Sequence, residues 1–137
     1  MRFVDTNILL YAVSTDTAEQ GKAAVARALL NEPDLALSAQ VLLEFYAQAT
    51  RATRPDALTQ SQATALVRSF TRYPVQATST DLVLAAIALA QSAQLSLWDA
   101  AIVAAAQALR CDELLTEDLN DGQVIGGIPI RNPFQRV

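Results

Sequence analysis

Histidine is absent from this chain of 137 residues, and cysteine and tryptophan each occur only once. Without an imidazole the protein has no histidine general base, no Ser-His-Asp triad and no histidine ligand for zinc. Any hydrolytic chemistry must therefore rest on carboxylates, on hydroxyls or on a bound metal ion.

The single cysteine, Cys111, excludes a disulfide within the chain, which fits a reducing compartment. The apolar stretch 8–13 is too short for the hydrophobic region of a secretory signal. The longest uncharged run, 82–98, is interrupted by glutamine and serine, so it predicts a buried helix and its exit loop rather than a membrane span. We therefore expect a cytoplasmic protein that has no membrane partner.

Basic residues are outnumbered, since 10 Lys and Arg against 14 Asp and Glu give a net charge of -4. A protein that binds nucleic acid by general phosphate attraction would normally be basic. The acidic balance disfavours a simple DNA-binding module, but it suits an enzyme that meets phosphate through cations held by its carboxylates. The length and the 52% apolar content predict one folded domain over residues 1–137.

Short apolar runs alternate with longer helical patterns along the chain. We expect strands at 2–4, 35–37, 73–76, 113–116 and 128–130, the last at a sheet edge because it contains Pro129. We expect helices over about 8–13, 15–31, 38–50, 59–72, 79–94 and 96–110, most of them opened by a serine, threonine or aspartate cap. This alternation predicts a three-layer α/β/α sandwich with a central parallel sheet.

Aspartates follow two of the predicted strands. Asp5 comes directly after the first strand, Asp118 follows the fourth by two residues, and Asp121 lies three residues further on. Ligands of open α/β sheets collect at the carboxyl ends of the strands, so these acids are expected at one rim of the sheet. Taken alone, each of them would more often be an ordinary helix cap or turn residue.

Two further acids lie on predicted helices. Glu44 flanks the apolar stripe of its helix beside Gln48; the alternative is a glutamate whose stem covers the core edge while its carboxylate reaches water. Asp99 stands in the first turn of a helix that has no further charge until Arg110; the alternative is capping and dipole stabilisation. Because that helix must be largely buried, its aspartate is expected to face a cleft or a cation.

Four acids from separate elements would repel one another if they met at one rim. Two Mg²⁺ or Mn²⁺ ions, about 3.5–4 Å apart, would neutralise them and stabilise an in-line phosphoryl displacement. Oxygen ligands suit these hard ions better than zinc or copper. The ions would also activate the water nucleophile that a chain without histidine needs.

The segments that carry these acids resemble, in order, those of PIN domains. They are Phe3-Val4-Asp5-Thr6-Asn7, Leu43-Glu44-Phe45, Trp98-Asp99-Ala100-Ala101, Leu114-Leu115-Thr116-Glu117-Asp118 and the tail Ile130-Arg131-Asn132-Pro133-Phe134. The resemblance spans the whole chain, and it implies the α/β/α sandwich, Mg²⁺-dependent endoribonuclease activity and a homodimer. It also implies a VapC-like toxin of a type II toxin–antitoxin system, inhibited by a small cognate antitoxin.

The resemblance also assigns roles to particular residues. The catalytic and metal-binding acids would be Asp5, Glu44, Asp99 and Asp118. Asp121 competes with Asp118 for the last place, or binds a second ion. Carboxylates would be held through hydrogen bonds by Thr6, Asn7 and Thr116. Contacts to the RNA substrate are expected from the arginines near two helix ends, the alternative being solvated charges: Arg51, Arg54, Arg68 and Arg72.

Other folds that gather aspartates at strand ends fit less well. A receiver-like phosphoacceptor domain needs a lysine at its site, and the only lysine, Lys22, lies in an early helix. A haloacid-dehalogenase phosphatase needs a second aspartate where this chain has Asn7, and a dinucleotide fold needs a glycine-rich turn that is absent after the first strand. The main alternative is a catalytically inactive, PIN-shaped module that binds RNA or protein.

Overall fold

The computed structural model describes all residues from 1 to 137 and contains one six-stranded sheet with the strand order β3-β2-β1-β4-β6-β5. The strands are β1 (Arg2–Val4), β2 (Leu35–Ser38), β3 (Val75–Gln76), β4 (Glu113–Leu115), β5 (Val124–Ile125) and β6 (Ile128–Arg131). The helices are α1 (Thr6–Val13), α2 (Gln20–Leu30), α3 (Ala39–Ala49), α4 (Gln60–Phe70), α5 (Thr80–Ala93) and α6 (Leu97–Ala108), with a short 3₁₀ turn at Thr17–Glu19.

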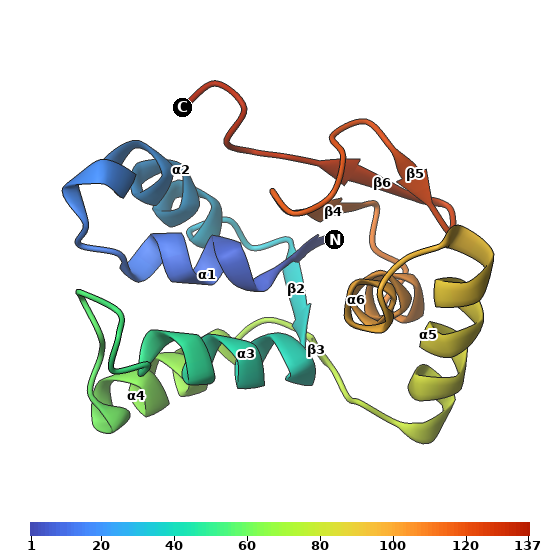
Figure 1. Ribbon diagram of the computed structural model, residues 1–137, viewed down its shortest axis with the longest axis horizontal. Helices are drawn as coiled ribbons and strands as arrows, with labels where there is room; N and C mark the ends of the chain where they lie inside the picture. The colour runs from blue at the N-terminus through green and yellow to red at the C-terminus, as the bar shows by residue number, and fades with distance from the viewer.

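Helices cover both faces of the sheet. All strand pairs are parallel except β5 with β6. The chain moves from β1 to β2 to β3 in one direction, and right-handed crossovers therefore place α1 to α4 on one face; the return from β3 to β4 places α5 and α6 on the other. Figure 1 shows these two groups on opposite sides of the strands. The predicted α/β/α sandwich with its parallel sheet is confirmed.

The order in which the chain adds strands to the sheet changes direction between β1 and β4. These two strands are neighbours in the sheet although they lie far apart in the sequence. In open α/β sheets, the crevice at such a switch point is where ligands bind, because the loops leaving the two strands turn away to opposite faces. The segments after β1 and β4 are those that carry Asp5 and Asp118. The topology therefore brings together acids that the sequence separates by more than a hundred residues.

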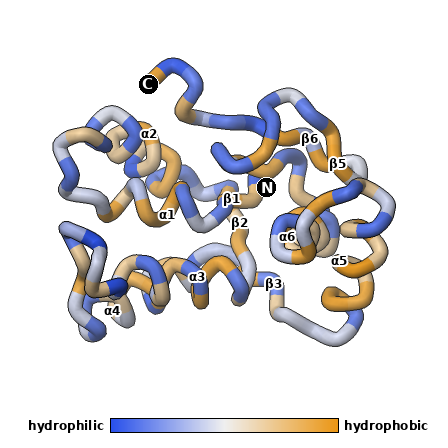
Figure 2. Tube along the Cα trace, viewed as in Figure 1, coloured by the Kyte–Doolittle hydropathy of each residue, from blue (hydrophilic) through white to orange (hydrophobic).

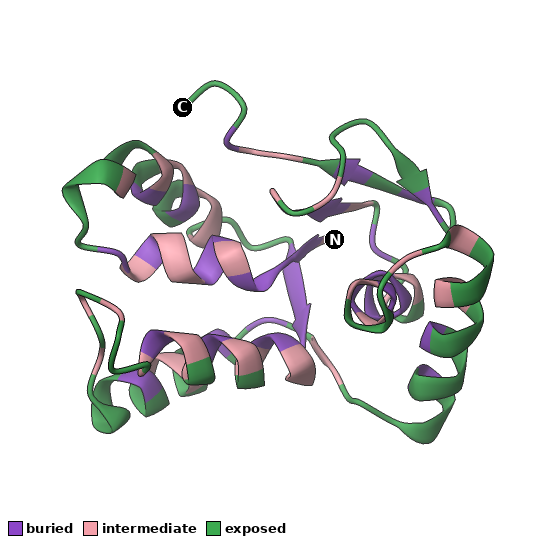
Figure 3. Cartoon of the chain, in the orientation of Figure 1, coloured by how far each residue is buried: buried purple, intermediate pink, exposed green.

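The core lies between the sheet and the inner helices. All four residues of β2 are buried, and so are six residues of α6. Figure 2 shows the apolar character of α5 and α6, and Figure 3 shows that burial concentrates in α6 while much of α5 is exposed. No single helix is long and apolar enough to span a membrane; only α5 and α6 together reach that length and hydropathy, bent by 115° at their junction.

The N-terminal helices differ from the predicted boundaries. The helix expected over 8–13 begins at Thr6, because the Asp5 carboxylate accepts a hydrogen bond from the Thr6 N–H and caps it. The helix expected over 15–31 is wrong at its start. A 3₁₀ turn capped by Asp16 precedes α2, which begins only at Gln20. The later caps, Ser38, Thr59, Ser79 and Ser96, are as predicted.

The prediction that the strand with Pro129 forms a sheet edge is wrong. β6 lies between β4 and β5, and a two-residue turn, Gly126-Gly127, joins β5 to β6. Both glycines have positive φ, +56° and +80°, as a tight hairpin turn of this length requires. Pro129 is tolerated inside the sheet because the register with β4 begins only at Ile130, so no bond to β4 needs its missing N–H.

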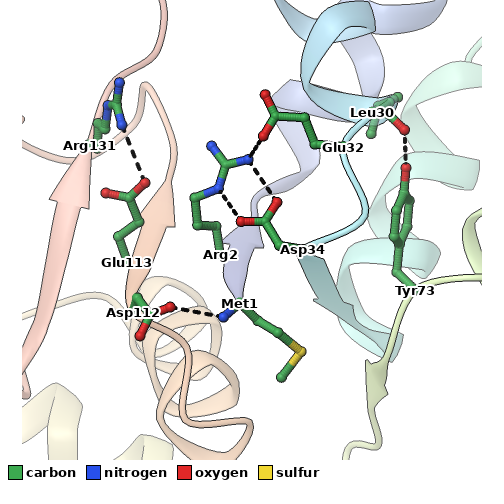
Figure 4. A network of polar contacts seen from close by, with 9 residues as sticks. All are labelled: Met1, Arg2, Leu30, Glu32, Asp34, Tyr73, Asp112, Glu113 and Arg131. Carbon is green, nitrogen blue, oxygen red and sulfur yellow. Dashed lines mark hydrogen bonds and ion pairs between the residues drawn. The ribbon is translucent and has the colours of Figure 1, made fainter.

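Charge pairs hold the amino end of the central strand β1 (Figure 4). Arg2 binds both oxygens of Asp34, at 2.9 and 3.1 Å, and also pairs with Glu32. The N-terminal amine contacts Asp112 at 2.9 Å. These pairs fix the beginning of β1 to the loops that precede β2 and β4, so the strand cannot slide and its other end keeps its place at the switch point.

Candidate active site

The carboxyl ends of β1, β2 and β4 open onto a cavity of about 310 Å³. Its wall also includes one face of α1, one face of α3, the first two turns of α6 and the loop after α3. A single cation, Arg54, shares the lining with six acidic residues: Asp5, Glu19, Glu44, Asp99, Glu117 and Asp118. Six of the 14 acids of the chain thus meet in one small space. The four predicted catalytic acids are among them.

Asp5 lies deepest in this cavity, with 7% of its surface exposed. Its Oδ1 accepts a hydrogen bond from the Thr6 N–H at 2.7 Å, and its Oδ2 accepts one from the Thr116 hydroxyl at 2.9 Å. Burial raises the pKa of Asp5 to about 6; the two hydrogen bonds oppose this rise, while the charges of Asp118 and Glu44 add to it. A bound cation would favour the ionised form.

The Thr116 hydroxyl connects three site residues. It donates to Asp5, and it accepts from the Asn7 side chain at 3.2 Å and from the Asp118 N–H at 3.1 Å. The Asn7 amide also donates to the Asp118 Oδ2 at 3.1 Å. The Asn7 Oδ1 is buried and has no hydrogen-bond donor, so the site contains an unused oxygen beside its carboxylates. Hydrogen bonds from Thr116 and Asn7 thus link Asp5 to Asp118.

The remaining two acids come from helices on opposite faces of the sheet. Glu44, on α3, accepts hydrogen bonds from the Thr6 hydroxyl at 2.8 Å and from the Gln40 side chain at 3.0 Å. Asp99 lies half-buried in the first turn of α6, where its N–H donates to the hydroxyl of the capping residue Ser96 at 3.1 Å. No protein donor contacts the Asp99 carboxylate, which leaves both of its oxygens available to a ligand.

The donor set of the cavity fits a hard divalent cation. All available ligands are carboxylate, amide or hydroxyl oxygens, the chemistry that Mg²⁺ and Mn²⁺ prefer. No three of the acidic side chains form one ready-made binding group. Such a cage is not required for Mg²⁺, which usually keeps several waters and takes only one or two carboxylates directly. The buried, unpaired Asn7 oxygen fits the same chemistry.

The structure does not bring Asp121 into this cavity. Asp121 lines a separate hollow near the C-terminus, and its Oδ1 accepts a hydrogen bond from the Asn132 N–H at 2.7 Å. Asp118 alone of the two lines the cavity. Asp121 therefore joins the loop after β4 to the segment after β6 through this hydrogen bond.

The four candidate RNA-binding arginines do not lie together. Arg54 lines the cavity and Arg51 is exposed nearby in the chain, whereas Arg68 and Arg72 belong to the other end of α4. Arg72 donates to the carbonyls of Ser69 and Leu30 and stacks on the Tyr73 ring at 4.4 Å. Arg72 therefore connects the end of α4 to the end of α2. Of the four arginines, only Arg54 lines the acidic cavity.

A second polar group on the cavity wall was not predicted from the sequence. Glu117 accepts a hydrogen bond from the Tyr11 hydroxyl and pairs with Lys22 at 2.9 Å. Burial and the Glu117 carboxylate raise the pKa of Tyr11, and the contact with Glu117 raises the pKa of Lys22. Tyr11 falls one helical turn after Asn7, on the same face of α1, and this spacing was the available signal.

Fold and cavity together define a class: α/β sandwiches with an acidic site at the switch point of a parallel sheet. The PIN domain family model matches residues 2–121, and the chain belongs to this family. The resemblance found in the sequence is thereby confirmed. No curated protein sequence matches the chain.

Solved structures of similar fold cover between 83% and 98% of the chain. A toxin–antitoxin complex from Klebsiella pneumoniae shares 27% identity, covers 98% of each chain and has a TM-score of 0.71. VapC20 from Mycobacterium tuberculosis, described as a toxin that cleaves the sarcin–ricin loop, shares 21% identity over 83% of this chain and 87% of its own, with a TM-score of 0.63. VapBC2 from Rickettsia felis, bound to a promoter DNA fragment, shares 18% over 96% and 97%, with a TM-score of 0.64.

Proposed function

We propose that this protein is an endoribonuclease that depends on Mg²⁺ or Mn²⁺ and acts as the toxin of a VapBC-like toxin–antitoxin pair. One observation carries the proposal. Six carboxylates and a single arginine line the cavity at the switch point, so a bare cavity would repel an RNA phosphate. Divalent cations would reverse that repulsion. The similarity to toxin–antitoxin proteins, including an RNA-cleaving toxin, supports this direction.

In this proposal Asp5, Glu44, Asp99 and Asp118 hold the cations. When bound, the cations would neutralise the developing phosphoryl charge and supply an activated water. The protein itself holds three of these carboxylates, those of Asp5, Glu44 and Asp118, before substrate arrives. Thr116 positions Asp5, and the Asn7 amide positions Asp118. On the other side of the cavity, hydrogen bonds from Thr6 and Gln40 hold Glu44, so the acids lose little freedom when they take up an ion.

The proposed partners follow from the same comparison. We propose RNA as substrate and a small antitoxin as inhibitor, because the neighbours from Klebsiella and Rickettsia are toxin–antitoxin assemblies. The open reading frame immediately upstream is expected to encode the antitoxin. The exposed apolar side chains of α5, Val83, Leu84 and Ile87, support a homodimer. RNA as substrate places the activity in the cytoplasm.

Asp99→Asn provides the first test. No protein donor contacts the Asp99 carboxylate, so its loss should remove a cation ligand without breaking a hydrogen-bond network. We expect wild-type protein to cleave a mixed single-stranded RNA with Mg²⁺ or Mn²⁺ and to stop with EDTA. We expect the variant to be slower by about 10²-fold or more. Calorimetry should also show much weaker Mg²⁺ binding by the variant.

The control is Asp81→Asn, since Asp81 is an exposed acid on α5 outside the cavity. It should bind metal and cleave RNA like wild type. Cleavage that persists in EDTA, or an Asp99→Asn variant as fast as wild type, would refute the mechanism. A wild-type protein that binds RNA but never cleaves it, with either metal, would favour the inactive binding module instead.

A further inference from the structure

Arg54 is the one cation on the wall of the acidic cavity, and its guanidinium is only partly used by the protein. It lies in the loop between α3 and α4, and 20% of its side chain is exposed. Its Nε donates to the Asp56 Oδ1 at 2.9 Å. The two terminal nitrogens, Nη1 and Nη2, have no acceptor in the protein, although the side chain is largely covered.

Asp56 holds this arginine in place. Its Oδ1 takes the Arg54 Nε, and its Oδ2 accepts the Thr15 N–H at 2.9 Å, which ties the loop to the segment after α1. The Thr15 N–H and the Arg54 charge lower the pKa of Asp56, so its carboxylate stays ionised. Backbone bonds within the loop, such as Leu58 N–H to the Ala49 carbonyl at 2.8 Å, stiffen it further. The guanidinium is therefore preorganised.

Most of the charged side chains around the cavity form no ion pair with one another. Six carboxylates share the lining with Arg54, yet its only ion pair is with Asp56, outside that lining. Among the six acids, only Glu117 has an ion pair, with Lys22. Other covered arginines use their terminal nitrogens; Arg27, for example, donates from Nε and Nη2 to the carbonyls of Ala12 and Ser14. In Arg54, by contrast, Nη1 and Nη2 contact no acceptor in the protein.

We propose that Arg54 binds a backbone phosphate of the RNA strand that enters the cavity; this inference rests on the proposed function. A guanidinium edge with two free nitrogens matches the two anionic oxygens of a phosphodiester, and this bidentate pairing is stronger and more directional than that of an ammonium. Cations held by the carboxylates would take the phosphate at the reaction centre. Arg54 would hold a phosphate on the α3–α4 side and so set the path of the strand.

The test uses four variants of the full chain: Arg54→Gln, Arg54→Lys, Asp56→Ala and, as control, Arg110→Gln. Arg110 is exposed at the end of α6 and has no ion pair. The measurement is kcat/KM for a synthetic mixed-sequence single-stranded RNA at fixed Mg²⁺ and rising KCl, together with the thermal midpoint of each variant. Each neutralised phosphate contributes a slope of about −0.7 in log–log form for a single strand.

For Arg54→Gln we expect kcat/KM to fall about 10-fold or more and the salt slope to weaken by about 0.7, with the loss mainly in KM. Arg54→Lys should keep the slope and recover only part of the rate, because lysine retains the charge but not the paired donors. Asp56→Ala should also keep the slope while raising KM, since Arg54 remains but is no longer held. Arg110→Gln should match wild type.

An Arg54→Gln variant that loses rate but keeps the wild-type salt slope would overturn the proposal and show that Arg54 only supports the fold or balances charge. A variant equal to Arg110→Gln in both rate and slope would also overturn it. In both cases wild-type cleavage leaves the proposed function standing. A wild-type protein that cleaves no RNA with either metal would overturn the proposed function, and this inference with it.

Discussion

The buried carboxylate of Asp5 destabilises the folded protein when no cation is bound. Its pKa is raised from 3.8 to about 6, chiefly by burial. Because the folded state then binds more protons than the unfolded chain between these values, stability falls as the pH rises from about 4 to 6. This difference in pKa between the folded and the unfolded chain corresponds to roughly 3 kcal/mol in the free energy of unfolding. In the proposed function, this loss of stability leaves an ionised carboxylate that can bind a metal ion.

Asp5→Asn should therefore be more stable than wild type at pH 7 in EDTA, by up to about 3 kcal/mol, and should lose this advantage near pH 4. The asparagine can still accept from the Thr6 N–H, so the cap of α1 survives. Urea unfolding at several pH values would measure the effect. A variant that is less stable than wild type at pH 7, without metal, would contradict the assigned cause of the shift.

At this scale the sequence predicted the acids better than their neighbours. Asp5 and Asp118 could be placed because they follow strands that end at the same rim. Asp121 could not, because the position of its side chain depends on the hydrogen bond to the Asn132 N–H, a contact between two loops. Glu117 and Lys22 were missed for a similar reason: their pairing joins residues 95 apart, and no local pattern records it.

At the scale of elements, hydrophobic periodicity and capping residues predicted most helices, but the short strand β5 was not predicted. β5 has only two residues, too few for an alternating pattern, although the Gly126-Gly127 pair between apolar residues is a strong hairpin signal. A hairpin predicted from this glycine pair would also have placed the strand with Pro129 inside the sheet, with β5 at the edge. Arg68 and Arg72 were grouped with Arg54 because the sequence does not show that α4 carries the chain away from the cavity before β3.

The turn between β5 and β6 should be sensitive to its two glycines in different degrees. A side chain at Gly127 meets open space, so Gly127→Ala suffers only from its positive φ, at a cost of about 1 kcal/mol. A Cβ at Gly126 would also collide with the Gln107 amide, which donates to the Gly126 carbonyl at 2.7 Å. Gly126→Ala should therefore cost more. Thermal unfolding of both variants would rank them; the reverse order would contradict the described turn.

At the scale of the whole molecule, the outer helix α5 presents an apolar surface to solvent. Leu84 is 60% exposed, with Val83 and Ile87 beside it. We expect a homodimer that buries these side chains, and we expect Leu84→Glu to shift it to the 14.7 kDa monomer, because a charge would have to be buried. Light scattering across micromolar concentrations would measure this. Thr64→Glu, which adds the same charge to an exposed position on α4, should remain dimeric.

β1 pairs with β4, although β4 follows it by more than a hundred residues and is therefore synthesised much later. The Thr116 hydroxyl reaches Asp5 across this span, and Asp118 arrives with it. A nascent chain that ends before Thr116 therefore contains Asp5 but lacks both the hydroxyl that positions Asp5 and the carboxylate of Asp118. If the proposed function holds, fragments released by premature termination before Thr116 should therefore be unable to cut RNA.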